Sequence, residues 1–129
     1  MSMKWIKLLF VVSAIYDGLL GAAFLLFGTE IFHRVGVVLP NHMGYIQFPA
    51  LILILFGAMF LRIAQDPLAR REWIPFGMGL KAAYCGVVFG HRLQGDIPAL
   101  WIPWAWADLA FLLLFFAAWW HLRRVTASA

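Results

Sequence analysis

Three charged side chains, those of Asp17, Lys81 and Asp108, lie near the middle of long apolar runs. A charge is costly in the centre of a membrane helix, so such a residue usually faces the protein interior and marks a functional site. Helical rise places Asp17 about 20 Å from Lys4 and Asp108 about 20 Å from His121, so both acids reach a similar depth. The flexible stem of Lys81 can extend toward them. We therefore predict that the three side chains point inward and meet.

The charges of this predicted centre do not balance, because two carboxyl groups share one amine. A shared proton, a bound cation or a hydrogen-bonded ligand would each resolve the excess negative charge. Such a centre suits proton transfer, general acid catalysis or the anchoring of a ligand. The alternative is a purely structural ion pair that determines which helices pack together. The sequence leaves both interpretations open.

Polar and aromatic residues near these charges predict a ligand pocket. Tyr84 follows Lys81 by about one helical turn, so we expect it to hydrogen-bond within the charged centre. Gln47 is a further polar candidate for the interior. Aromatic residues flank Asp108 at three- and four-residue spacing: Trp101, Trp104 and Phe111. Such a wall can line an apolar pocket for a lipid, a quinone or an isoprenoid, or can simply pack and anchor the helices.

Three histidines outside the apolar runs are the weak candidates for a metal or haem site: His33, His42 and His91. Their spacing matches no metal-binding motif, so we predict no metal site and name no cofactor. The single cysteine, Cys85, excludes an internal disulfide bond and a cysteine-based zinc cluster.

Four apolar runs predict the fold that positions these residues. The chain is 64% hydrophobic and only 12% charged, and two of the runs have no polar stripe, which argues against a soluble helical protein. We predict one domain with transmembrane helices over about residues 4–28, 43–64, 72–92 and 98–121. The third run is the shortest. Short connections make this an all-α, up-down-up-down antiparallel bundle.

Local signals predict where the helices end and pack. Gly28 and Thr29 should end the first helix. Pro75 and Pro103 should loosen the first turns of the third and fourth. Small residues recur every seven positions in the first helix and would allow close packing against another helix: Ala14, Gly21 and Gly28.

Basic residues predict the orientation of the bundle. Most of them gather at the N-terminus, in the loop of residues 62–72 and at the C-terminus: Lys4, Lys7, Arg62, Arg70, Arg71, Arg123 and Arg124. The positive-inside rule then places both termini in the cytoplasm. The net charge of +4 therefore follows membrane topology and does not indicate nucleic-acid binding.

Two segments, YDGLLGAAFLLFGTEIF (residues 16–32) and IQFPALILILFGAMFLRIAQDP (residues 46–67), resemble the DoxX-like group of small four-span bacterial membrane proteins. The resemblance covers about the first half of the chain and implies a location in the bacterial inner membrane. It also implies a small subunit that accompanies oxidoreductases or quinone-linked systems. The group commonly has an arginine where this chain has Tyr16 and Asp17, so no site residue is carried over.

The sequence thus leaves three functional hypotheses. The first is an accessory subunit of a membrane system, or a binding protein for an apolar ligand, in a homo-oligomer or a larger membrane complex. The second is an isomerase or cyclase that uses Asp17 or Asp108 as a general acid, with Trp104 near the developing cation. The third is a small proton-coupled transporter that acts as a dimer.

Overall fold

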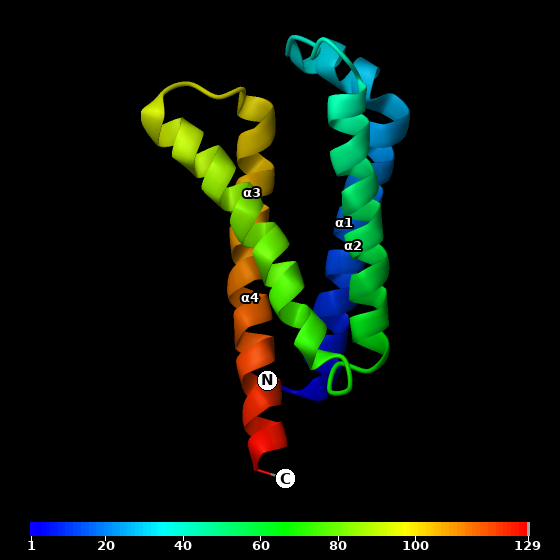
Figure 1. Cartoon of the computed structure of the whole chain (residues 1–129), viewed down its shortest axis with the longest axis vertical. Helices are drawn as coiled ribbons and strands as arrows, with labels where there is room; N and C mark the ends of the chain where they lie inside the picture. Colours follow the sequence, from blue (N-terminus) through cyan, green and yellow to red (C-terminus); the bar gives the residue numbers. More distant parts are fainter. Residues whose placement is uncertain (129) are drawn as a thin grey trace.

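The computed structural model describes residues 1–128, and these form helices, turns and loops without β-strands. The predicted all-α fold is therefore confirmed. Four α-helices run along the long axis of the molecule (Figure 1). Their bounds are Met3–Val35 for α1, Gly44–Gln65 for α2, Ile74–Gln94 for α3 and Ile102–Ala127 for α4. Short 3-10 helices, Arg71–Trp73 and Ala99–Trp101, precede α3 and α4.

Helix α1 does not end at Gly28 and Thr29, as the sequence suggested. It bends at Phe27, whose backbone angles are non-helical, and continues to Val35. The helix stops at Gly36, which has a left-handed φ of 70° and an N–H that bonds back to the last turn. Gly28 has another purpose, because a Cβ atom there would lie 3.2 Å from the Met43 side chain. It is buried for packing and does not end the helix.

The two prolines also differ from prediction. Pro75 and Pro103 occupy the first turns of α3 and α4, directly after the 3-10 helices. A helix does not need the N–H of its first residues, and the fixed φ of proline suits that position. These prolines therefore start their helices, where we expected them to loosen a turn inside a longer span.

The helices form two antiparallel pairs, with α1 packed along α2 and α3 packed along α4 (Figure 1). The first pair is close because of its glycines. A Cβ atom on Gly21 would lie 2.5 Å from the carbonyl oxygen of Ala50, and one on Gly57 would lie 3.1 Å from that of Ala14. The stripe of small residues on α1 therefore serves the packing of α2 within the same chain.

Two apolar clusters join the pairs at opposite ends of the bundle. The proximal cluster lies toward the chain termini and draws buried side chains from all four helices: Ile6, Phe10, Phe60, Ile63, Ile74, Phe115 and Leu122. The distal cluster lies toward the other end and contains Phe24, Phe32 and Ala50, with Leu20, Ile46 and Trp101 packed against it. The charged residues lie on the stretch of the helices between these two clusters.

Three segments are long and apolar enough to cross a membrane: α1, α2 and Ala99–Ala127, which includes α4. The molecule is thus an integral membrane protein by its composition and helix lengths. Helix α3 is not among these segments, and the predicted fourth span is not established by hydropathy. Large apolar side chains are nevertheless exposed on α3 as on the others; Phe76 is 66% exposed and Val87 60%.

Candidate functional site

The three charged residues meet in the interior, as predicted. The ammonium of Lys81 on α3 donates to both carboxylate oxygens of Asp17 on α1, each at 2.8 Å. It also donates to Oδ1 of Asp108 on α4 at 3.1 Å. Lys81 is 0% exposed, Asp17 1% and Asp108 6%. These residues, here called the charged centre, therefore connect three helices that are far apart in the sequence.

Aromatic rings surround the ammonium of Lys81. Its Nζ atom lies 5.3 Å from the ring centroid of Tyr16, 5.2 Å from that of Phe111 and 5.8 Å from that of Phe60. A cation is attracted to the electron-rich face of an aromatic ring, and the attraction grows where water is excluded. The ammonium is thus held by carboxylates and by rings together.

The two acids are not equivalent. Both oxygens of Asp17 accept a hydrogen bond from Lys81. Asp108 accepts through Oδ1 alone, and among the described residues Oδ2 has no hydrogen-bond donor. Asp108 is therefore the acid that retains the capacity to bind another molecule.

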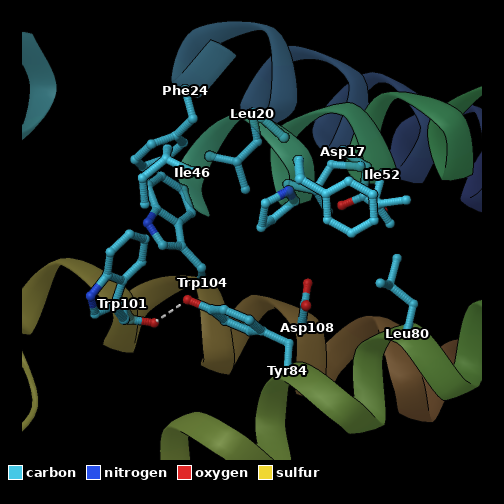
Figure 2. Close-up of a pocket in the computed structure, with 14 residues that line it drawn as sticks. Asp17, Leu20, Phe24, Ile46, Ile52, Leu80, Tyr84, Trp101, Trp104 and Asp108 are labelled. Carbon is cyan, nitrogen blue, oxygen red and sulfur yellow. Dashed lines mark hydrogen bonds between the residues drawn. The ribbon is translucent and has the colours of Figure 1, made fainter. Parts of the chain in front are cut away.

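A cavity of about 410 Å³ lies next to the charged centre, between the α1–α2 pair and the α3–α4 pair. Figure 2 shows the Asp108 carboxylate projecting into this space, with Tyr84 beside it and Asp17 across from it. Apart from Asp17, Tyr84 and Asp108, the lining is apolar or aromatic: Leu20, Phe24, Ile46, Phe48, Pro49, Ala50, Ile52, Leu53, Leu80, Trp101 and Trp104. The volume is in the range of about 300–1,000 Å³ that is usual for small-molecule sites.

Tyr84 lines the cavity but does not bond to the charges, which corrects the sequence prediction. Its hydroxyl donates to the backbone carbonyl of Trp101 at 2.9 Å (Figure 2). The Trp101 ring in turn packs against Phe24 and Phe32, with centroids 5.8 and 5.7 Å away. The hydrogen bond therefore joins α3 to the start of α4 and fixes the Tyr84 ring as part of the cavity wall.

The other predicted ligand-binding residues divide into three groups. Trp101 and Trp104 line the cavity, as expected. Phe111 is not among the lining residues and contacts Lys81 and the Tyr16 ring instead. Gln47 is exposed and is also absent from the lining, so the prediction that it faces the interior is corrected. One position along a helix turns a side chain by about 100°, and Ile46 takes the inward place.

The three histidines are not brought together with other potential metal ligands in the described part of the chain. His33, His42 and His91 are all exposed, and the described residues contain no group of three or more potential ligands. His42 has a local structural role, because its Nδ1 atom accepts a hydrogen bond from the backbone N–H of Gly44 at 2.9 Å. This bond lies at the first residue of α2.

Sequence reasoning missed several residues of the site. Tyr16 is a polar aromatic residue next to Asp17, and that position in the sequence was a usable signal. Phe60 and Ile52 gave no signal, because apolar residues in an apolar run look alike. Three buried polar atoms lack a partner among the described residues: Ser13 Oγ, Tyr16 OH and Trp104 Nε1. The last belongs to Trp104, whose side chain lines the cavity.

Comparisons of the chain with protein-family models, with curated proteins and with solved structures found no match. The resemblance to the DoxX-like group remains a prediction from the sequence. The functional argument therefore depends on the geometry of the charged centre and the cavity.

Proposed function

We propose that this integral membrane protein binds an elongated apolar molecule in the cavity, with the polar end of that molecule at Asp108. The observation that carries the proposal is the composition of the cavity, which is apolar except at Asp17, Tyr84 and Asp108. A site of this kind fits a molecule with a hydrocarbon body and one polar group, such as a lipid, a quinone or an isoprenoid. Burial of the body provides affinity, and the unshared oxygen of Asp108 provides orientation.

The proposed ligand reaches the cavity from the bilayer, between α2 and α3. Phe48 on α2 lines the cavity and is also 67% exposed, so the cavity wall extends to the outer surface of the bundle. Tightly packed side chains of the proximal cluster close the cavity toward the chain termini. This arrangement favours lateral exchange with the membrane over passage from one side to the other.

The proposal includes four membrane crossings with both termini in the cytoplasm. Two observations support a crossing by α3. Its 21 residues span about 31 Å, close to the thickness of the hydrocarbon core. The charge that lowers its hydropathy, Lys81, is fully buried and does not face lipid. The chain ends lie at the same end of the bundle as the segment between α2 and α3, where the arginines gather (Figure 1).

Mass spectrometry of the protein extracted gently from membranes tests this function. We expect an apolar molecule to co-purify with the wild-type protein, and Ile52→Trp to reduce its amount about tenfold or more by filling the cavity. Leu55→Trp is the matched control, because Leu55 lies one turn further along α2 and is 63% exposed. Equal amounts of bound molecule in both variants would refute the proposal.

The isomerase and transporter hypotheses use the same two acids and remain predictions from the sequence, as do a homo-oligomer and a larger complex. Turnover of a bound molecule, or flux that follows a pH gradient in proteoliposomes, would extend a binding function to either one. Both extensions require the cavity to be occupied first.

A further inference from the structure

The unshared oxygen of Asp108 indicates what the polar end of the ligand is. Asp108 is only 6% exposed, and its carboxylate projects into the cavity (Figure 2). The ammonium of Lys81 donates to Oδ1 of Asp108 and to both carboxylate oxygens of Asp17. Oδ2 is not among the fully buried unpartnered atoms of the described residues, so it is accessible from the cavity, and an occupant that covers it should supply a hydrogen-bond donor at this point.

The charge of the site restricts the polar end of the ligand more than the missing hydrogen bond does. Two carboxylates face one ammonium, and the other described residues that line the cavity carry no charge. A ligand with a carboxylate or phosphate end would add a second excess negative charge and be repelled. An alcohol can donate to Asp108, but the site would then still need a proton shared between the two acids to balance its charge. A protonated amine donates to Asp108 and balances the charge without a further proton on either acid.

The cavity wall also suits a cation. Tyr84, Trp101 and Trp104 bring three aromatic side chains to the cavity, and the ring of Tyr84 lies beside the Asp108 carboxylate (Figure 2). The protein already holds one ammonium in this way, because Lys81 contacts carboxylates and aromatic rings together. The Tyr84 side of Asp108 thus offers a carboxylate beside an aromatic ring, without an ammonium from the protein.

We infer that the ligand is a single-chain cationic amphiphile whose protonated amine binds Oδ2 of Asp108 beside Tyr84. Its hydrocarbon chain lies along Leu20, Phe24 and Ile46 toward the distal cluster. This inference rests on the proposed function and specifies the chemistry of its polar end. The completed site contains two carboxylates and two ammonium groups, with aromatic rings around both cations.

Equilibrium binding to the protein in lipid nanodiscs tests the inference with three probes of equal chain length: dodecylamine, dodecanol and dodecanoate. Binding to the Ile52→Trp variant measures partition into the lipid and is subtracted. We expect dodecylamine to bind about 10- to 100-fold more tightly than dodecanol, from a hydrogen bond to a charged partner, and dodecanoate to bind most weakly. This comparison uses wild-type protein and does not depend on the folding of a variant at Asp108.

The Asp108→Asn variant should lose the preference for the amine while it still binds dodecanol. Glu30→Gln removes an exposed acid of α1 and should leave the preference unchanged. Dodecanol binding as tightly as dodecylamine, or an amine preference that persists in Asp108→Asn, would overturn the inference and leave the binding function intact. Failure of all three probes to exceed the Ile52→Trp background would refute the binding function as well.

Discussion

Lys81 and Asp17 form a buried ion pair in which one ammonium donates to both oxygens of one carboxylate, each at 2.8 Å. The two residues are 64 positions apart, on α3 and α1, which belong to different helix pairs. The same ammonium reaches Asp108 on α4 at 3.1 Å. A single side chain therefore connects the two halves of the bundle and leaves one carboxylate oxygen directed into an apolar cavity.

Removal of the shared cation should destabilise the fold strongly. In Lys81→Met, two buried carboxyl groups lose their partner, and we expect the free energy of unfolding to fall by about 3–5 kcal/mol. Reversible unfolding in mixed micelles of a mild and a denaturing detergent measures this change. Lys7→Met, at an exposed position of α1, is the control and should unfold like wild type. A loss below about 1 kcal/mol for Lys81→Met, as for an exposed pair, would contradict the buried geometry.

The two acids should respond differently to neutralisation. Asp17→Asn removes the charge that accepts two of the hydrogen bonds of Lys81, whereas Asp108→Asn removes the charge that accepts one. We therefore expect Asp17→Asn to lower the free energy of unfolding more, by about 1–3 kcal/mol beyond the loss in Asp108→Asn. The same unfolding measurement compares the two variants. Equal losses would mean that Lys81 is shared symmetrically between the acids.

Close packing of α1 on α2 predicts a contrast between two neighbouring glycines. A Cβ atom on Gly21 would lie 2.5 Å from the carbonyl oxygen of Ala50, so Gly21→Ala forces the helices apart at a cost of about 1–3 kcal/mol. A Cβ atom on Gly18 meets nothing within 4 Å. Gly18→Ala should therefore raise stability by up to about 1 kcal/mol through helix propensity. Thermal unfolding of both variants measures the contrast, and a stabilised Gly21→Ala would disprove this helix contact.

The proposed crossing of α3 predicts which loops share a side of the membrane. In a Cys85→Ala background, single cysteines at Asn41 and Gly95 should react with a membrane-impermeant maleimide on spheroplasts. A cysteine at Ala69 should react only after the membrane is permeabilised. If the cysteine at Gly95 behaves like the one at Ala69, then α3 does not cross the membrane and the four-span topology fails.

Hydropathy and helical geometry were enough to predict the helices and the meeting of the three charged residues. The helical rise predicted that Asp17 and Asp108 lie at the same depth in the membrane. The cost of a charge in lipid predicted that Lys81 points toward them. Hydrogen-bond partners could not be predicted in the same way. Tyr84 shares a helix face with Lys81, but its hydroxyl donates to the backbone carbonyl of Trp101 instead of to the acids.

The cavity itself was predictable only in part. Its aromatic wall showed a periodic signal in the fourth run, through Trp101 and Trp104. Its other wall, on α2, comes from residues such as Ile52 that resemble the exposed Leu55 in type. Which apolar residues face a cavity depends on the separation of two helix pairs. That separation arises from packing at both ends of the bundle and is not encoded in local pattern.

A crystal structure grown from a lipidic phase, with dodecylamine added, tests the central claim most directly. We predict that Lys81 lies between the carboxylates of Asp17 and Asp108, and that elongated density fills the cavity with its nitrogen against Oδ2 of Asp108. Side chains collapsed into the cavity, or an Asp108 carboxylate turned toward lipid, would contradict the account.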